Sequence, residues 1–351
     1  MVDSVVRVAA AAAGALVLAR ALRRPQSDRK CVVVDAGSGS TRATLFGSLS
    51  NGRVVVLKGP ERVDARVADA LADAGKTDAF VGDVSKAVRA MAAGQYRGKL
   101  PVYMGATAGG RESLRSAETG AEARVKKAMA EQVHDRAIFK VLSEGAEADC
   151  ELRAVKYVGG QHLGLLSGGG KSMQLATDSH LRSISLDSFK GRLLVEKKGA
   201  AGAAMHDWEC RRKITNTLLG DCRTPRFGGE FGVIELAAGT LRRAMDGDFV
   251  PVAKTQSWLV STGLVAEAAA EPAPRLSVAD AIELLEKRKA YLMRDGTFKN
   301  AQAITYIIQM LAILEIAFHD DAILHLLDDG ETSPKPAWPL GLYLKWREAL
   351  Y

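Results

Sequence analysis

The feature that most constrains the fold is a pattern that occurs twice: an apolar run, a turn rich in glycine and serine, and another apolar run. The first copy is CVVVDAGSGSTRATLF, residues 31–46, and the second is HLGLLSGGGKSMQLAT, residues 162–177. Short apolar runs bounded by turn residues are typical of buried strands. Each copy therefore predicts a strand–turn–strand unit, and the repetition predicts two lobes of related architecture.

The rest of the chain mixes helical and strand patterns, which indicates an α/β class. Helical apolar spacing occurs over 66–92, over 111–133 and over 144–158. A buried strand before 105 leads into the glycine turn GATAGGR, and RAIFKVLS predicts another strand. Strand character continues over 183–196, and three helical segments follow residue 274. The 351 residues are enough for two domains. We expect four parts: a targeting or anchor segment 1–27, lobe I over 28–160, lobe II over 161–332, and a C-terminal helix in 333–351 that packs back on lobe I.

The first 27 residues differ in composition from the rest. VAAAAAGALVLARAL is apolar and is followed by the basic stretch RRPQSDRK. A spanning helix needs about 20 apolar residues, so this stretch is short for one. It fits a signal peptide, a short anchor or an organelle presequence, with an exposed alanine-rich helix as the alternative. Membrane association through residues 5–22 is the corresponding prediction.

Charge and cysteine content exclude two classes. The net charge is +7, from 48 basic and 41 acidic residues, but no basic block is interleaved with aromatic residues. This pattern argues against a nucleic-acid partner. The four cysteines lack CxxC spacing, which argues against a structural zinc site. Cys210 and Cys222 either form a disulfide or stay reduced.

The two glycine turns have the composition of anion sites. GSGST, residues 37–41, and GGGKS, residues 168–172, expose several backbone N–H groups in one concavity, and their hydroxyls add donors; we call them the first turn and the second turn. Asp35 ends the strand before the first turn. It either holds a divalent cation through water or caps the turn by hydrogen bonds to nearby N–H groups.

Two further stretches carry candidate site residues. In GATAGGR, Thr107 and Arg111 suit phosphate, and the alternative is an ordinary helix start, which is itself an anion site. In SEGAEADCEL, the carboxylates of Glu144, Glu147 and Glu151 share one helix face. One of them is positioned to deprotonate water, or else the three form a solvated acidic face.

In order, the motifs DAGSGSTR, GATAGGR, SEGAEADCELRAVKYV and LLSGGGKSMQLA resemble the apyrase family of nucleoside phosphatases and, more distantly, the exopolyphosphatases. TYIIQMLAIL and AWPLGLYL resemble the C-terminal region of the apyrase family. The resemblance implies the two-lobed fold of the actin, hexokinase and Hsp70-like (RNase H-like) superfamily, in which each lobe is a mixed β-sheet flanked by helices.

The resemblance also implies an activity: metal-dependent hydrolysis of the terminal phosphoanhydride of nucleoside di- and triphosphates, with Ca²⁺ or Mg²⁺ as cofactor. Aligned without gaps through Lys156 and Tyr157, the general base of the family falls on Glu147. Asp35 would contact the metal through water. The residues that would hold phosphate or nucleotide are Ser38, Gly39, Ser40, Thr41, Thr107, Ala108, Gly109, Arg111, Gly169, Gly170, Lys171, Ser172 and Gln174. By the same resemblance we expect a membrane-associated or endomembrane and secretory location.

Several positions depart from the family pattern, among them Ala148, Cys150 and Leu152 in the third motif. Ala146 replaces the first glutamate of a pair, and Ser167 replaces the aspartate that precedes the second turn. A serine there removes one negative charge, which weakens a metal site. Lys171 adds a cation inside the turn, where it can contact phosphate directly. The alternatives are therefore an exopolyphosphatase-like phosphatase and a catalytically weak nucleotide-binding regulatory protein. The sequence does not fix the oligomeric state.

Overall fold

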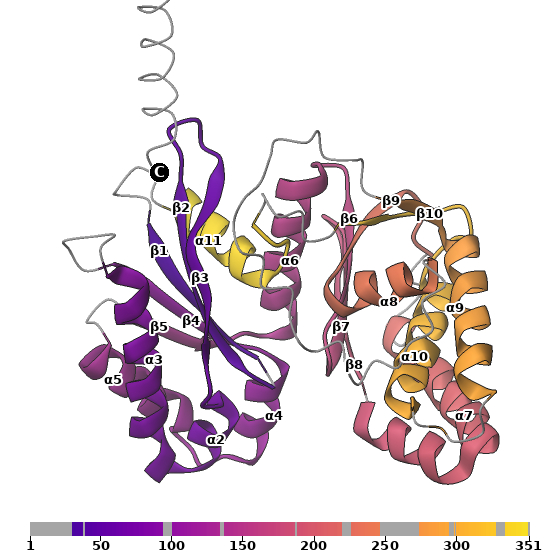
Figure 1. Ribbon diagram of the computed structural model, residues 1–351, viewed down its shortest axis with the longest axis horizontal. Coiled ribbons are helices and arrows are strands. Elements are labelled where there is room, and N and C mark those ends of the chain that lie inside the picture. Colours follow the sequence, from indigo (N-terminus) through magenta and orange to yellow (C-terminus); the bar gives the residue numbers. More distant parts are fainter. Residues whose placement is uncertain are drawn as a thin grey trace, which may run out of the picture. The chain divides into compact units, whose positions relative to one another are not determined.

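A computed structural model describes residues 30–37, 39–93, 100–133, 137–186, 188–219, 226–245, 274–294, 298, 300–327 and 334–349 (Figure 1). By compactness the chain divides into Met1–Leu142 with Leu342–Tyr351, which we call unit 1, and Ser143–Gly341, which we call unit 2. This division falls before the helix SEGAEADCEL, whereas the sequence analysis placed the boundary after it, at residue 160. The segment 1–27, Ser38 and Cys222 lie outside the described residues.

Unit 1 is built on a five-stranded mixed sheet in the order β3-β2-β1-β4-β5. β1, β2 and β3 are antiparallel neighbours, whereas β4 and β5 run parallel to β1. The strands are β1 (Cys31–Ala36), β2 (Thr41–Ser48), β3 (Val54–Val63), β4 (Val102–Ala106) and β5 (Ala137–Val141). The helices are α2 (Val67–Ala72), the short 3₁₀ helix η2 (Ala74–Lys76), α3 (Thr77–Ala92), α4 (Ala108–Ser116) and α5 (Ala121–Gln132).

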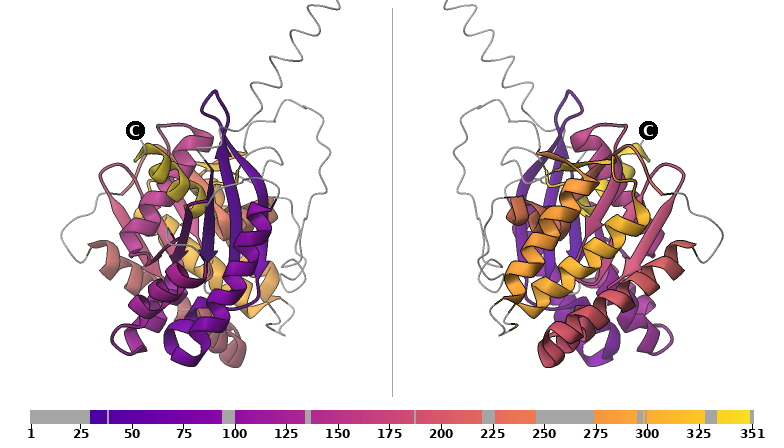
Figure 2. Two further views of the ribbon diagram at one scale, coloured as in Figure 1. Left: turned by 90° about the vertical axis from the view of Figure 1, so that its left-hand side faces the viewer. Right: turned by 90° about the vertical axis from the view of Figure 1, so that its right-hand side faces the viewer.

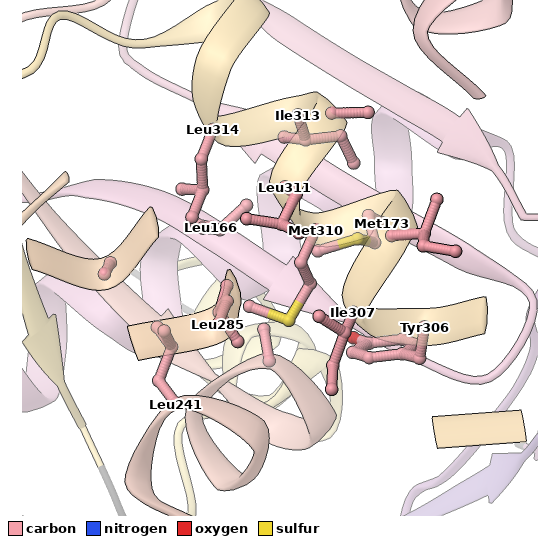
Figure 3. Packing of buried hydrophobic residues seen from close by; sticks show 14 of the residues in the cluster. Leu166, Met173, Leu241, Leu285, Tyr306, Ile307, Met310, Leu311, Ile313 and Leu314 are labelled. Carbon is pink, nitrogen blue, oxygen red and sulfur yellow. The ribbon is translucent and has the colours of Figure 1, made fainter. Parts of the chain in front are cut away.

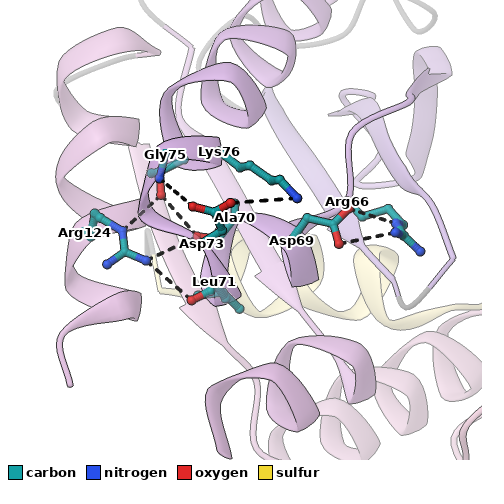
Figure 4. Close-up of polar contacts among 9 residues, drawn as sticks. Arg66, Asp69, Ala70, Leu71, Asp73, Gly75, Lys76 and Arg124 are labelled. Atoms are coloured by element: carbon teal, nitrogen blue, oxygen red, sulfur yellow. Dashed lines mark hydrogen bonds and ion pairs between the residues drawn. The ribbon is translucent and has the colours of Figure 1, made fainter. Parts of the chain in front are cut away.

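The helices of unit 1 pack on the sheet through an apolar core. Hydrogen bonds from a side chain of one helix to backbone carbonyl groups of another also hold the helices together. The core includes Val34 of β1, Val84 of α3 and Val125 of α5, all fully buried. The Arg124 guanidinium donates hydrogen bonds to the carbonyl oxygens of Ala70 and Leu71, at the end of α2 (Figure 4). These bonds satisfy carbonyl groups that a helix end leaves without partners.

Unit 2 contains a six-stranded mixed sheet in the order β10-β11-β9-β6-β7-β8. β6, β7 and β8 are antiparallel neighbours, and β9 and β11 run parallel to β6. The strands are β6 (Gly164–Gly168), β7 (Ser172–Ala176), β8 (Leu181–Ser185), β9 (Glu230–Ile234), β10 (Arg275–Ser277) and β11 (Ile323–Leu326). The helices are α6 (Glu144–Gly159), α7 (Ser188–Leu219), α8 (Glu235–Met245), α9 (Val278–Met293), α10 (Ala301–Ala317) and α11 (Trp338–Glu348), of which α11 continues into unit 1.

Different helices cover the two faces of this sheet. α6 contributes Ala148 and Leu152 to an apolar cluster with Leu165 of β6 and Ala176 of β7. α10 lies on the other side, where Leu311 and its neighbours meet Leu166 of β6 (Figure 3). α9 packs beside α10 (Figure 2). α10 is apolar around most of its circumference, which is typical of a helix buried on several sides.

The two sheets share one strand arrangement. The order β3-β2-β1-β4-β5 in unit 1 corresponds to β8-β7-β6-β9-β11 in unit 2, with the same antiparallel and parallel pairings. This confirms the predicted fold class of a mixed sheet flanked by helices in each lobe.

Three predictions are corrected. Residues 188–196 are helical and not extended, because α7 begins at Ser188 directly after β8. Short apolar runs such as RLLVE fit a helix as well as a strand, and Val195 faces the helical core. The single helix predicted over 111–133 is interrupted between α4 and α5, where Gly120 has a φ of 95°. The predicted membrane or secretory location is contradicted, because no helix in the described part of the chain has the length and apolar character needed to cross a bilayer.

Candidate functional site

The first turn connects β1 to β2 through a tight hydrogen bond. The Gly37 N–H donates to the carbonyl oxygen of Ser40 at 3.0 Å. This bond brings the described turn residues, Gly39, Ser40 and Thr41, close to the end of β1. The Thr41 side chain is fully buried, and its hydroxyl has no hydrogen-bond partner among the described residues.

Asp35 lies at the base of the first turn. It pairs with Arg42 of β2 and with Gly105 of β4 in the sheet register. Its Oδ1 atom lies 3.9 Å from the position that a Cβ atom would take on Gly37. The carboxylate is therefore beside the turn, where the sequence analysis expected it.

α4 begins at the same edge of the sheet. Thr107 follows β4, and its N–H donates to the carbonyl oxygen of Ala36 at 3.4 Å. Thr107 precedes the helix as its N-cap residue, but its side chain makes no capping hydrogen bond. Ala108 and Gly109 form the first turn of α4. Because a helix N-terminus presents free N–H groups, this position suits an anion.

Arg111 has a structural contact that the sequence did not indicate. Its Nη1 atom donates to the carbonyl oxygen of Leu142 at 3.0 Å, just after β5. The guanidinium thus links α4 to the end of a neighbouring strand. Its predicted contact with phosphate stays a prediction.

The second turn repeats the hydrogen bond of the first. The Gly169 N–H donates to the carbonyl oxygen of Ser172 at 2.9 Å. The side chain of Gln174 donates from Nε2 to the Ser172 hydroxyl, also at 2.9 Å. The remaining members are Gly170 and the exposed Lys171, whose carbonyl oxygen accepts a hydrogen bond from the N–H of Leu186.

The shared hydrogen bond defines which residues correspond in the two turns. Gly169 corresponds to Gly37, and Ser172 corresponds to Ser40. By the same spacing, Ser167 occupies the position that Asp35 holds in unit 1. The Ser167 side chain is fully buried, and its hydroxyl has no hydrogen-bond partner within the described residues.

Strand alternation places Ser167 and Gln174 on the face that α6 covers. The two residues pair directly between β6 and β7. Leu165, two residues before Ser167, packs against α6. Ala176, two residues after Gln174, also packs against α6. Since alternate residues of a strand share a face, Ser167 and Gln174 point toward the side of α6.

α6 holds the predicted general base in its first turn. The Ser143 hydroxyl caps the helix by accepting a hydrogen bond from the N–H of Ala146 at 3.2 Å. Glu144 and Glu147 lie in this first turn, and Glu147 is only 5% exposed. Glu151 follows one helical turn later and is 1% exposed. These two carboxylates are therefore buried, which disagrees with the alternative of a solvated acidic face.

One acidic residue at the second turn was missed by the sequence analysis. Glu235 follows β9 directly and forms a parallel bridge with Gly168. Its Oε2 atom lies 3.8 Å from the position that a Cβ atom would take on Gly169. The apolar run FGVI before it was the available signal, but a run of four residues is too short to predict a strand end reliably.

The described residues fit a hard cation that is bound mainly by phosphate and water. They contain no group of three or more His, Cys, Asp or Glu side chains placed to hold a metal. The Asp35 carboxylate lies beside the first turn and would hold such a cation through water. Mg²⁺ in particular is usually held by one or two carboxylates together with waters and substrate phosphates.

A small cavity of about 90 Å³ adjoins the second turn. It is lined in part by Ser185, Leu186, Lys190 and Lys213. Ser185 pairs with Ser172, and Leu186 is bonded to Lys171, so the cavity lies at the end of β8 next to the turn. Its lining also contains the acid Glu209 and apolar residues of the core that α7 and α10 share, so the cavity lies on the face of the sheet opposite α6.

Comparison with solved structures gives similarity in fold over nearly the whole chain. A Ppx/GppA family member from Aquifex aeolicus superposes with a TM-score of 0.58 and 13% identity, over 92% of this chain and 99% of that chain. An exopolyphosphatase from Cytophaga hutchinsonii gives a TM-score of 0.56 and 12% identity, over 91% and 98%. No family model and no curated protein matches the sequence.

These similarities confirm the predicted two-lobed actin- and hexokinase-like fold. Of the two sequence resemblances, they agree with the exopolyphosphatases, which the motifs resemble more distantly. At this identity the similarity concerns the fold. The apyrase resemblance and the role of each site residue rest on the sequence motifs.

Proposed function

We propose that this protein hydrolyses phosphoanhydride bonds and that its substrate is a linear polyphosphate. The observation that carries the proposal is the repeated turn, in which Gly37 and Gly169 make the same hydrogen bond at the same place in two similar sheets. A glycine turn with free N–H groups binds anionic oxygens, and each unit contributes one. The fold shared with an exopolyphosphatase supports this reading.

The water is activated by Glu147. Its carboxylate is buried in the first turn of α6, the helix that covers the face to which Ser167 and Gln174 point. A general base in this role accepts the proton of the attacking water while the phosphoanhydride bond breaks. The Gln174 amide and the Ser172 hydroxyl are already hydrogen-bonded to each other, which fixes both for orienting the water or a phosphate oxygen.

The phosphates are held by backbone N–H groups and by cations. In unit 1 the first turn and the N-terminus of α4 offer N–H groups to an anion. In unit 2 the second turn offers N–H groups and Lys171 offers a positive charge. Asp35 would hold Mg²⁺ or Ca²⁺ through water, and the cation would neutralise charge on the phosphates.

A second candidate substrate is a nucleoside di- or triphosphate. The motif GATAGGR, with Thr107 and Arg111, favours this reading because of its resemblance to the apyrase family. Both substrates contain the same reacting bond, a phosphoanhydride. They differ in what lies beyond the reacting phosphates.

The deciding experiment measures phosphate release from a panel of substrates. The full chain is incubated with Mg²⁺ or Ca²⁺ and with polyphosphate, ATP, ADP, GDP or UDP at equal phosphoanhydride concentration. We expect the highest kcat/KM with polyphosphate. A preference for a nucleotide would support the second candidate. Nucleotide binding without phosphate release from any substrate would leave only a regulatory, catalytically weak protein.

A further inference from the structure

Ser167, the altered position before the second turn, lies close to an acidic residue of the neighbouring strand, Glu235. Position 167 carries serine where the equivalent position of the first turn carries Asp35, so the second turn lacks a carboxylate on its own strand. β9 is the parallel neighbour of β6, with Ser167 opposite Ile234. The next residue along each strand forms the bridge between Gly168 and Glu235. Glu235 therefore lies at the carboxyl end of the adjacent strand.

The corresponding place in unit 1, Ala106, directly precedes Thr107 of the predicted site. There Ala36 is opposite Ala106, and Thr107 then leads into α4. In unit 2, Glu235 takes the place of Ala106 and begins α8 itself. In open α/β sheets, ligands bind at the carboxyl ends of neighbouring parallel strands. Glu235 thus stands at the edge where both sheets carry their turns.

The backbone holds Glu235 in an unusual conformation. Its φ of 58° lies in the left-handed region, which a residue other than glycine rarely adopts. The chain turns here from β9 into α8 without an intervening residue. The carboxylate comes to lie next to the second turn, with Oε2 3.8 Å from the Cβ position of Gly169.

A buried hydroxyl group points to the same place. Tyr306 of α10 is 7% exposed, and its hydroxyl has no hydrogen-bond partner among the described residues. Its Oη atom lies 2.0 Å from the position that a Cβ atom would take on Gly168. Burial raises the pKa of Tyr306 well above its ordinary value, the negative charge of Glu235 raises it further, and the positive charge of Arg243 lowers it. The Tyr306 hydroxyl thus lies at Gly168 and the Glu235 carboxylate at Gly169, which are consecutive residues of the second turn.

We propose that Glu235 supplies the carboxylate of a divalent-cation site at the second turn, in place of the acid that Ser167 lacks. Oxygen ligands of this kind suit Mg²⁺, Ca²⁺ or Mn²⁺. Glu235 and the Tyr306 hydroxyl bind the cation directly or through its waters. The cation brings positive charge to the turn that binds phosphate. This inference deepens the proposed function, but cation binding is measurable without a substrate.

The first test titrates the full chain with Mn²⁺ alone and follows free Mn²⁺ by electron paramagnetic resonance. We expect Glu235→Gln to weaken Mn²⁺ binding about 10- to 100-fold, the range found when groups around a metal are removed. Glu283→Gln, an exposed acid on α9, is the matched control and leaves the affinity unchanged. Unchanged Mn²⁺ affinity in Glu235→Gln, or no Mn²⁺ binding by the natural chain, overturns the proposal.

A second test needs no change at Glu235. Tb³⁺ replaces hard divalent cations and emits when a nearby tyrosine is excited. We expect emission from Tb³⁺ bound to the natural chain and a loss of at least half of it in Tyr306→Phe. Equal emission from both proteins places the cation elsewhere and overturns the proposal. Phosphate release is assayed separately, so that an inactive protein with Glu235-dependent Mn²⁺ binding refutes the proposed hydrolysis alone.

Discussion

Asp35 and Ser167 occupy the same position in their two turns, each two residues before the glycine whose N–H closes the turn. The closing bonds are nearly equal in length, 3.0 Å from Gly37 and 2.9 Å from Gly169. The backbone has therefore kept one geometry in both units, whereas the side chain has changed from a carboxylate to a hydroxyl. The difference between the two turns is one of charge.

Restoring the charge tests this difference directly. We expect Ser167→Asp to lower the Mg²⁺ concentration needed for half-maximal phosphate release by about tenfold, which corresponds to about 1.4 kcal/mol of cation binding. Ser167→Asn, of similar size but neutral, is the control and leaves the Mg²⁺ requirement unchanged. The same Mg²⁺ requirement in the aspartate variant would show that position 167 does not face the cation.

Lys171 is expected to bind phosphate. A hydrogen bond to a charged group contributes about 1.5–3 kcal/mol, so Lys171→Met should raise KM for polyphosphate about 10- to 100-fold. Steady-state kinetics measure this, with Lys126→Met as control because Lys126 is an exposed lysine of α5. An unchanged KM would remove Lys171 from the phosphate site.

The Tyr306 side chain fits its place only because residue 168 is a glycine. A Cβ atom on Gly168 would lie 2.0 Å from the tyrosine Oη atom. We expect Gly168→Ala to lower the free energy of unfolding by about 1–3 kcal/mol, the usual range for overpacking. Combining it with Tyr306→Phe should recover part of this loss. Denaturant unfolding of the two single variants and the double variant gives the coupling, and simple additivity would contradict the contact.

The acid side of the stability profile depends on Glu230. The pKa of Glu230 is lowered from its ordinary value of 4.5, chiefly by the hydrogen bond from His325, which is 2.6 Å long. The unfolded chain therefore binds this proton more readily than the folded chain. The stabilisation is complete above pH 4.5 and is lost as the pH falls through the lowered folded-state pKa.

The variant Glu230→Gln has no carboxylate to titrate. We expect its melting temperature to fall less than that of the natural protein when the pH is taken from about 6 to about 3. Parallel melting curves at both pH values measure this. An equal fall in both proteins would mean that Glu230 does not contribute to acid stability.

The strand–turn–strand units were predictable because their pattern is local. In VVVDAG and in LLSGG, an apolar run leads into glycine residues. The structure has the strands β1 and β6 at these two places. The helix around Glu147 was also predictable, since Ser143 supplies its cap. Such features depend on neighbouring residues alone, which a sequence displays.

The missed features depend on contacts between distant residues. Glu235 comes next to Gly168 only because β9 pairs with β6, and no local pattern encodes that pairing. Residues 188–196 were expected to be extended because RLLVE is compatible with both states. The packing of α7 against α10 decides between them, with Val195 buried in the shared core.

The central claim is that Glu147 activates water for phosphoanhydride hydrolysis, and one comparison tests it most directly. Phosphate release from polyphosphate with Mg²⁺ is measured for the natural protein, for Glu147→Gln and for Glu144→Gln, a change in the same helical turn. We predict a rate about 10²- to 10⁴-fold lower in Glu147→Gln alone, with substrate binding and melting temperature retained. Equal rates in the natural protein and in Glu147→Gln would contradict the account.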